Sequence, residues 1–463
     1  MQSISSVPLR QSLPQLQLIR QLHVFAERRG VQLYLVGGAV RALLLNQSLT
    51  DLDFALADDA LAFAKAFADK TGEAFVKLEE QPPTARIVIR DTRLTLDFVG
   101  FRAEMLEADL RLRDLTINAM ALDLSSLLTK PDVNLIDPCD GFSDLQTQTL
   151  YFPSEGVVID DPLRLLRVYR FSAQLGFDIP EATINLIRLH KDRLPQVSSE
   201  RIRDELIKIL TVKNATAYLR HMDETRLLSQ IIPEIEEIRE LHQDALDRRL
   251  RTLKMFEIKP IPDTLQSYRP QIEAYLHGQL THDLCRRQLL KLALLLRDSR
   301  TETAVQIANR LRLGRKAVQL MRCLVENHLY LMDSTDSKGQ IMRRSMIRFL
   351  RRVGDDWLGI LLISYANIRS AGKDMRWINA PPTVEVLLKQ IADFYYNEFA
   401  PIMERGRLIT GNDILQTFGR MPGVQIGRIL HHIEDLQFEG EIETPDEALE
   451  AVCTFLQNHG TET

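Results

Sequence analysis

The stretch GGAVRALLLNQSLTDLDFAL (37–56) decides how the first third of the chain folds. Two glycines close the apolar run VQLYLVG (31–37), and a helical apolar pattern begins directly afterwards. TDLDFAL (50–56) then alternates with a period of two, which places Asp51 and Asp53 on one strand face and apolar residues on the other. The stretch therefore predicts a strand, a tight turn, a helix and a second strand that carries two neighbouring carboxylates.

The sequence on either side continues this mixed pattern and then becomes helical. RIVIR (86–90) and LTLDFVGF (94–101) are typical of strands, and residues 58–72 have a helical pattern. From Asp160 the pattern is helical almost to the C-terminus. We predict an α+β chain in which a small head with a mixed sheet precedes an all-helical body. The predicted domains are a head at 1–152, a helical neck at 153–235, a helical body at 236–335 and a helical tail at 336–463.

Composition limits the class of protein. With 463 residues, 45% of them hydrophobic, the chain can bury several cores. The net charge of −5 argues against a wholly basic surface, so RNA contact would need a local basic face. The four cysteines form no Cys-x-x-Cys pair, and no apolar run approaches the roughly 18 residues of a membrane helix. These features predict a soluble protein of the reducing cytoplasm with no membrane partner.

A third carboxylate, Asp97, projects from the polar face of residues 94–101. An isolated Asp-x-Asp is more often a solvated strand face, and a Gly-Gly pair is often only a tight turn. Their combination indicates more, because glycines let backbone N–H groups approach a phosphate and Arg41 adds a positive charge. Three carboxylates from two strands could hold two Mg²⁺ ions roughly 3.5–4 Å apart, which suits displacement at phosphorus.

With these motifs in place, the sequence resembles a known family. Residues 37–56 look like the signature of the nucleotidyltransferase branch that contains bacterial-type (class II) tRNA CCA-adding enzymes and bacterial poly(A) polymerases. The resemblance covers nearly the whole chain. Later segments agree in order and character: RDLTINAMALD (113–123), IDPCDGFSDL (136–145), DDPLRLLRVYRFSAQLGF (160–177), SSERIRDELIKIL (198–210) and LITGNDILQTFGRMPGVQIGRIL (408–430).

The resemblance implies an enzyme that transfers nucleotides from CTP and ATP to the acceptor stem and 3' end of tRNA, with two Mg²⁺ ions. It implies a catalytic head, a nucleotide-selecting neck, a degenerate His-Asp body and a tRNA-binding tail for the four predicted domains. The implied roles are metal ligation and catalysis for Asp51, Asp53 and Asp97; a triphosphate cradle for Gly37, Gly38 and Arg41; sugar and phosphate binding for Arg113, Asp114 and Asn118; base selection for Asp161 and Arg164; and nucleotide binding for Arg167 and Arg170.

The base-selecting roles of Asp161 and Arg164 agree with base chemistry. Cytosine and adenine each present an amino donor beside a ring-nitrogen acceptor, and a carboxylate with a guanidinium complements both. Guanine and uracil present the reverse pattern, and each unpaired buried group costs roughly 1–3 kcal/mol. We expect both residues on one face of a helix at a spacing of i,i+3, where an intrahelical salt bridge is the alternative.

The sequence departs from the family pattern in three places: at Ala42, in the helical body, and in the length of the connection between Arg102 and Arg113. Ala42 stands where an acidic residue usually follows the Gly-Gly-x-x-Arg run, which removes a supporting contact without removing a metal ligand. In the body, the Arg297–Asp298 pair and arginines at 248–249 stand where a His-Asp metal site would place histidines, and His328 remains. One histidine cannot hold a metal cluster, so we predict no phosphohydrolase activity there.

A basic cluster at 338–352 is a candidate RNA-binding surface. Lysine and arginine contacts of this kind position RNA through its phosphates without reading sequence. A solvated helix face is the alternative. The candidate residues are Arg343, Arg344, Arg348 and Arg351, and Lys338 lies in the same cluster.

Two alternatives concern the reaction itself. A poly(A) polymerase of this family usually has a basic run after the third carboxylate and a basic tail, and VGFRAEMLEADL (99–110) and the acidic C-terminus provide neither. A catalytically inactive RNA-binding protein would not need the carboxylates. Within the family, the ten residues 103–112 form a shorter connection than full CCA-adding enzymes generally have. The short connection favours a partial, CC-adding enzyme, and ordinary loop-length variation with full activity is the alternative.

Overall fold

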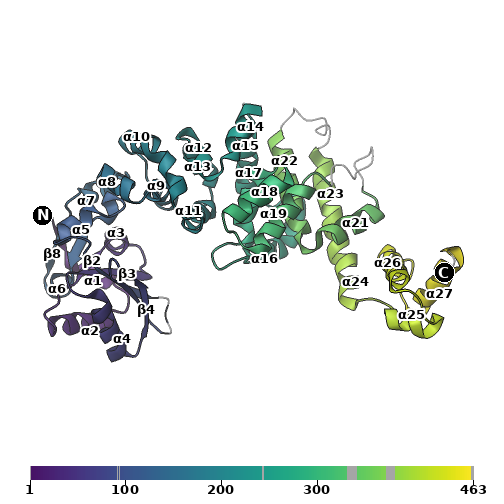
Figure 1. Cartoon of the computed structure of the whole chain (residues 1–463), viewed down its shortest axis with the longest axis horizontal. Coiled ribbons are helices and arrows are strands. Elements are labelled where there is room, and N and C mark those ends of the chain that lie inside the picture. Colours follow the sequence, from purple (N-terminus) through teal and green to yellow (C-terminus); the bar gives the residue numbers. More distant parts are fainter. Residues whose placement is uncertain are drawn as a thin grey trace. The chain divides into compact units, whose positions relative to one another are not determined.

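The computed structural model describes residues 2–90, 92, 94–241, 244–330, 341–371 and 381–459. The chain forms two compact units, Met1–Glu237 and Ile238–Thr463, which are coloured purple to teal and teal to yellow in Figure 1. The first unit holds the mixed sheet and a set of helices, and the second is helical. This arrangement confirms the predicted α+β class. The finer division into four domains remains a prediction.

The described residues of the first unit form one eight-stranded mixed sheet in the order β1-β8-β7-β2-β3-β6-β5-β4. β3 and β6 are parallel, and the other neighbouring pairs are antiparallel. The strands are β1 (Gln2–Ser5), β2 (Tyr34–Val36), β3 (Asp51–Leu56), β4 (Ala74–Glu79), β5 (Thr84–Val88), β6 (Thr95–Gly100), β7 (Ala121–Asp123) and β8 (Asp132–Ile136).

Alternation along β3 and β6 separates a core face from a polar face. Phe54 and Phe98 are fully buried and stack with ring centroids 5.3 Å apart. Phe63 of α4 (Ala60–Thr71) packs on Phe98 from the helix side, at a centroid distance of 5.6 Å. Since side chains alternate, Asp51, Asp53 and Asp97 project from the opposite face, as the sequence predicts.

The other helices of the first unit fall into two sets along the chain, within the predicted head and after it. In the head they are α1 (Ser6–Gln11), α2 (Leu16–Glu27), α3 (Gly38–Leu44), α5 (Leu106–Arg111), η1 (Thr116–Asn118), α6 (Leu124–Thr129) and α7 (Gly141–Thr147). Further along the chain they are α8 (Glu155–Asp160), α9 (Arg164–Leu175), α10 (Glu181–His190), η2 (Lys191–Gln196), α11 (Ser199–Thr211), α12 (Ala215–Glu224), α13 (Leu227–Ile231) and α14 (Glu234–Leu241), the last crossing the boundary between the units.

One predicted helix is interrupted. Asp161 and Arg164 were expected on one helix face, but α8 ends at Asp160 and α9 begins at Arg164. Asp161 has an extended backbone, with φ −138° and ψ 94°. Pro162 explains the break, because a proline ring disfavours helical geometry in the residue before it. The prediction that Asp161 and Arg164 share one face of a continuous helix at a spacing of i,i+3 is therefore wrong.

The second unit consists of helices throughout its described residues, apart from one isolated bridge. They are α15 (Ala245–Ile258), η3 (Asp263–Tyr268), α16 (Arg269–His277), α17 (Arg286–Leu296), α18 (Thr301–Arg310), α19 (Arg315–Asn327), α21 (Arg343–Val353), η4 (Gly354–Asp356), α22 (Trp357–Ala371), α23 (Pro381–Phe394), η6 (Tyr395–Phe399), α24 (Ala400–Arg405), α25 (Gly411–Phe418), α26 (Gly423–Glu439) and α27 (Pro445–His459). None of the described helices is both long and apolar enough to span a membrane.

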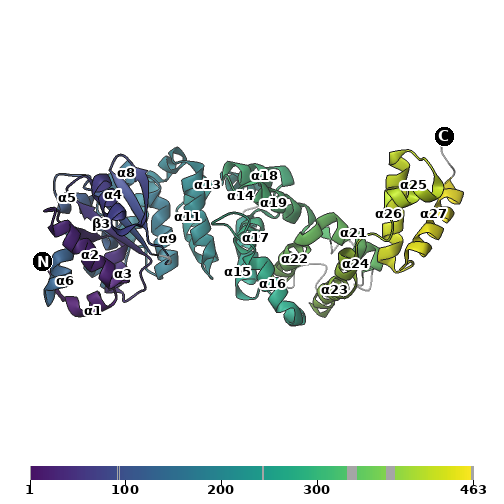
Figure 2. The ribbon, with the colours of Figure 1, turned by 90° about the horizontal axis from the view of Figure 1, so that it is seen from below.

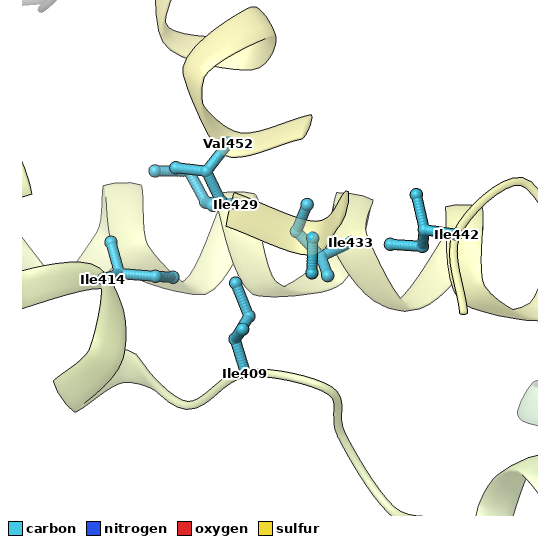
Figure 3. Close-up of a cluster of buried hydrophobic side chains, with 7 residues drawn as sticks. Ile409, Ile414, Ile429, Ile433, Ile442 and Val452 are labelled. Atoms are coloured by element: carbon cyan, nitrogen blue, oxygen red, sulfur yellow. The ribbon is translucent and has the colours of Figure 1, made fainter. Parts of the chain in front are cut away.

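The last three helices, α25 to α27, share a small apolar core of their own (Figure 2). Side chains from α26 and its neighbours converge there (Figure 3). Thr410 caps α25 with a reciprocal bond to Asp413, which fixes where the helix begins. The labelled core residues are Ile409, Ile414, Ile429, Ile433, Ile442 and Val452.

Candidate active site

The glycine turn lies between β2 and α3, beside the carboxylate face. Gly37 has φ +68° and ψ −134°, a conformation that L residues rarely adopt. A Cβ at Gly37 would lie 3.0 Å from Nη1 of Arg113 and 3.6 Å from Oδ2 of Asp53. A Cβ at Gly38 would lie 3.5 Å from Nη2 of Arg41. The glycines therefore keep the backbone open next to two arginines and a carboxylate, as a phosphate-binding turn requires.

The three carboxylates lie on two adjacent parallel strands. Asp53 of β3 is directly opposite Asp97 of β6, and Asp51 is opposite Thr95. Asp51 accepts hydrogen bonds from the hydroxyls of Thr95 at 2.6 Å and Thr50 at 2.9 Å. Burial and the charges of Asp97 and Asp51 raise the pKa of Asp53 to about 6. The structure thus places the three predicted metal ligands on the same face of two adjacent strands, where Arg113 and Arg86 offset only part of the negative charge at Asp53.

Asp97 is held by a partner that the sequence analysis missed. Arg86 of β5 is its cross-strand neighbour and donates from Nε to Oδ1 at 2.8 Å and from Nη2 to Oδ2 at 2.7 Å. This is a bidentate, charge-assisted pair. Alternation along RIVIR places Arg86 on the polar face, but only the register of the β5–β6 hairpin shows that it meets Asp97.

The donor set fits magnesium, although the side chains are not grouped around a metal. Three carboxylates are the oxygen ligands that Mg²⁺ prefers, and a cation would relieve the repulsion that raises the pKa of Asp53. In the described residues, no group of three or more histidine, cysteine, aspartate or glutamate side chains is arranged to hold a metal. Asp97 is turned to Arg86 and Asp51 to Thr95. Metal binding therefore requires these side chains to reorient.

A cluster of buried arginines lies beside the glycine turn. The Arg41 guanidinium hydrogen-bonds the Asn118 side chain, and its Nε has no hydrogen-bond partner in the part of the chain that the structure describes. Burial lowers the pKa of Arg41 to about 10, so the side chain stays charged at neutral pH. A buried cation without a carboxylate partner attracts an anion strongly, because little water screens it.

One aromatic ring organises this cluster. The guanidinium carbons of Arg41, Arg167 and Arg170 lie 5.0, 5.8 and 3.7 Å from the ring centroid of Phe171. Such cation–π contacts fix the orientation of the planar groups. Arg170 also pairs with Glu205 of α11. Phe171 therefore joins the neck helix α9 to Arg41 in the head.

Asp114 contacts the same arginine cluster through Arg167 and Asn118. It is buried and accepts hydrogen bonds from Nδ2 of Asn118 at 3.0 Å and from the Leu115 amide at 2.9 Å. Nη2 of Arg167 lies 2.6 Å from its Oδ2. Burial opposes its ionisation, but Arg167 and Asn118 keep the pKa of Asp114 below the usual range. Asp114 and Asn118 therefore hold two of the arginines instead of facing open solvent.

Arg113 also lies beside the glycine turn, and two further residues contact one another next to it. Arg113 donates from Nη2 to Oδ2 of Asp109 at 3.2 Å, and the Arg102 amide donates to Oδ1 of Asp109 at 3.0 Å. Burial and the charge of Arg113 lower the pKa of Arg102. The sequence analysis missed Arg102 and Asp109. Arg102 could have been predicted as a site residue because it follows the strand that carries Asp97. No feature of the sequence indicates that Asp109 is buried.

Asp161 and Arg164 both lie at the junction of α8 and α9, but they do not pair with each other. Asp161 accepts from Nη2 of Arg201 of α11 at 2.8 Å. Arg164 donates to the carbonyls of Val157 at 3.0 Å and Arg113 at 3.5 Å. Among the described residues, Asp161 and Arg164 therefore do not form the alternative intrahelical salt bridge, and Asp161 pairs with Arg201 instead. Base selection by these residues remains a prediction.

The candidate RNA-binding arginines of α21 are mostly engaged by acidic residues of the second unit. Arg343 pairs with Glu398, Arg344 with Glu439 at 2.7 Å, and Arg351 with Glu434 at 2.8 Å and with Asp435. The Arg348 hydrogen bonds go to the Arg344 carbonyl at 3.4 Å and the Ser345 hydroxyl at 3.5 Å. Lys338 lies outside the described residues. Most phosphate contacts here would compete with ion pairs, and the RNA-binding role remains a prediction.

Buried guanidinium groups occupy the region expected to be a degenerate His-Asp site. Arg249 donates to Asp298 at 3.3 Å and to the Leu295 carbonyl at 3.1 Å. Arg297 donates to the Asn367 side chain at 2.7 Å. Two cations at this place would repel a metal ion, and the absence of phosphohydrolase activity remains a prediction.

Comparisons with known proteins give three family matches along the chain. The family described as "Poly A polymerase head domain" matches residues 33–151, "Probable RNA and SrmB-binding site of polymerase A" matches 176–239, and "tRNA nucleotidyltransferase domain 2 putative" matches 361–453. A CC-adding tRNA nucleotidyltransferase of Geobacter sulfurreducens is 28% identical over 432 residues, covering 91% of this chain and 92% of the relative. An A-adding tRNA nucleotidyltransferase of Deinococcus radiodurans is 28% identical over 450 residues, covering 93% and 96%.

Solved structures share the fold over the full length. An apo CCA-adding enzyme has a TM-score of 0.72 at 22% identity, with 100% of both chains covered. The Thermotoga maritima CCA-adding enzyme complexed with tRNA has a TM-score of 0.68 at 23% identity, covering 98% of this chain and 100% of that one. The chain belongs to the family of class II tRNA nucleotidyltransferases and poly(A) polymerases.

Proposed function

We propose that this chain is a tRNA nucleotidyltransferase of the CCA-adding type, which extends the 3' end of tRNA from CTP or ATP without a nucleic-acid template. The observation that carries the proposal is the register of β3 and β6, which puts Asp53 opposite Asp97, in a head that also holds the cluster of buried arginines around Phe171. The relatives that match over 91% and 93% of the chain are named as tRNA nucleotidyltransferases. Similar solved structures are named as complexes with CTP, ATP and tRNA.

The residues of the site suit phosphoryl transfer. The Gly37 turn and Arg41 would bind the triphosphate, and the burial of Arg41 strengthens its attraction to phosphate oxygens. Asp51, Asp53 and Asp97 would hold Mg²⁺, which when bound neutralises the phosphates and activates the attacking hydroxyl. The 3'-hydroxyl of the RNA loses its proton to solvent, and its oxygen forms a bond to the α-phosphorus of the nucleotide. The bond from that phosphorus to the oxygen shared with the β-phosphate breaks, and pyrophosphate leaves.

Asp161 and Arg164 would select the base from the junction of α8 and α9. They are not paired with each other, so each keeps hydrogen-bonding capacity for a ligand. Asp161 would accept from the amino group of cytosine or adenine, and Arg164 would donate to the ring nitrogen. Arg201 holds Asp161 in place at 2.8 Å.

The connection between Arg102 and Arg113 supports cytidine addition as the specific activity. It folds as α5 (Leu106–Arg111), whose Leu106 and Leu110 are buried in an apolar cluster against the sheet. Asp109 is 1% exposed and ties this helix to both flanking arginines. A pocket that serves a purine after a pyrimidine must change shape, and a connection fixed in this way resists such movement. The chain would therefore add two cytidines.

Three transcripts test the proposal: tRNA ending before the CCA, after CC and after CCA, each incubated with Mg²⁺ and either CTP or ATP. We expect two CMP residues on the first transcript and no extension of the other two. Addition of AMP after CC would show a full CCA-adding enzyme or an A-adding enzyme. This result would refute the cytidine specificity but not the proposal that the chain is a tRNA nucleotidyltransferase. A long poly(A) product would indicate a poly(A) polymerase, and no incorporation on any transcript would refute the enzymatic proposal.

A further inference from the structure

Arg86 is a charged residue inside the carboxylate site that the proposed reaction does not use. It lies in the middle of β5, directly across from Asp97, so the backbone of a two-strand hairpin fixes its position. Both oxygens of Asp97 accept from it, at 2.8 and 2.7 Å. The Asp97 hydrogen bond and the nearby charges of Asp51 and Asp53 raise the pKa of Arg86, against the effect of burial.

The Arg86–Asp97 ion pair can be replaced by contacts of each residue with a ligand. The Arg86 side chain is 39% exposed and that of Asp97 is 17% exposed, so the guanidinium can leave toward solvent. Both Asp97 oxygens accept from Arg86 of β5, the strand on the other side of β6 from β3, and the trio is not grouped around a metal. A guanidinium released from a carboxylate binds a phosphate group equally well, because the same planar fork fits both.

We propose that Arg86 couples binding of the divalent cation to binding of the nucleoside triphosphate. Without nucleotide, Arg86 occupies Asp97 and competes with the cation for it. When a triphosphate arrives, the guanidinium moves to its oxygens and frees Asp97 for the metal. Each ligand then strengthens binding of the other by the same factor, since binding free energies are reciprocal. The inference rests on the proposed function, because it assumes that Asp97 is a metal ligand.

Mn²⁺ binding tests this without any turnover. Mn²⁺ titrations followed by electron paramagnetic resonance would be made on the full chain, with and without an α,β-non-hydrolysable CTP analogue. For the wild type we expect weak Mn²⁺ binding alone and much tighter binding with the analogue. For Arg86→Gln we expect Mn²⁺ affinity without nucleotide to rise on the order of tenfold, a difference of about 1.4 kcal/mol. The tightening by the analogue should shrink by a similar factor.

Two control variants separate the effect of the bidentate Arg86–Asp97 pair from a general effect of charge. Arg86→Lys keeps the positive charge but has no planar fork, so it should also bind free Mn²⁺ more tightly, though less so than Arg86→Gln. Lys77→Gln on β4 removes one positive charge from the same sheet at an exposed pair with Glu80, and should behave as the wild type. Thermal unfolding would establish that all variants fold.

The outcomes of the Mn²⁺ titrations distinguish failure of the coupling by Arg86 from failure of the proposed metal site. Equal nucleotide-free Mn²⁺ affinity in the wild type and Arg86→Gln would overturn the coupling by Arg86, while the metal assignment would stand. A weaker affinity in Arg86→Gln would also overturn it, because Arg86 would then support the metal site. No Mn²⁺ binding by the wild type, even with the CTP analogue, would refute the metal site of the proposed function itself.

Discussion

Asp53 is a residue whose functional role opposes the stability of the fold. Its pKa is raised to about 6 by burial and by Asp97 and Asp51, so the folded state binds a proton more tightly than the unfolded chain does. Stability from this group is therefore greatest at low pH and is lost as the pH rises from the ordinary range of an aspartate to about 6. Above that pH, the metal-free protein carries an uncompensated charge that Mg²⁺ would neutralise.

Asp53→Asn should therefore raise stability and abolish catalysis. In EDTA at pH 8 we expect the free energy of unfolding to rise by about 1–3 kcal/mol relative to the wild type. Each kcal/mol should raise the Tm by roughly 2–4 °C. At pH 4, where Asp53 is protonated in the wild type, the gain should nearly vanish. Nucleotide incorporation should fall below detection while tRNA affinity changes less than about twofold. Calorimetry and filter binding provide the two measurements, and wild-type turnover would contradict the metal assignment.

Asp161 gives a prediction about specificity instead of stability. It is partly exposed and paired with Arg201, so Asp161→Ala should leave the Tm almost unchanged. The variant should lose much of its preference for CTP over UTP, because nothing then accepts from the cytosine amino group. The ratio of kcat/KM for the two nucleotides measures this. An unaltered ratio would mean that another pair selects the base.

At the scale of elements, the sequence predicted what depends on local pattern and missed what depends on packing. Alternation in β3 and β6 was sufficient to place the three carboxylates on one face, and the glycine pair marked the turn. The break between α8 and α9 was readable from Pro162 but was overlooked. Arg86 and Asp109 could not be assigned, because their roles arise from contacts across the hairpin and around α5.

The tie between α5 and its flanking arginines makes a prediction of its own. Asp109→Asn keeps the shape of the side chain but removes the charge that holds Arg113 at 3.2 Å. We expect a loss of about 1–3 kcal/mol in stability, because a buried charge-assisted contact is weakened. If α5 restricts the pocket to cytidine, the variant should also add AMP after CC at a higher rate relative to CMP. Asp69→Asn on the exposed side of α4 is the matched control. Equal loss of both activities would assign Asp109 a structural role only.

For the whole molecule, the distribution of charge matters more than its total. The net charge of −5 gives no general attraction to RNA, and buried arginines of the first unit gather around Phe171, where we propose that nucleotide binds. In the second unit, the arginines of α21 are largely neutralised by Glu434, Asp435 and Glu439 of α26. Binding of tRNA must therefore come from a few local contacts, which single substitutions can detect.

Arg348 decides whether α21 is one of those contacts. Among the described residues, its side chain hydrogen-bonds Arg344 and Ser345 of its own helix, whereas Arg344 is held by Glu439. If α21 binds RNA phosphates, Arg348→Gln should weaken tRNA binding and lower the slope of log K against log salt by about one. Arg344→Gln should have a smaller effect, because its charge is already paired. Lys65→Gln on α4, on the far side of the sheet from the carboxylates, controls for the loss of one positive charge. An identical salt slope for Arg348→Gln and the wild type would leave α21 as a helix that joins α26 through ion pairs, with its arginines serving stability and not recognition.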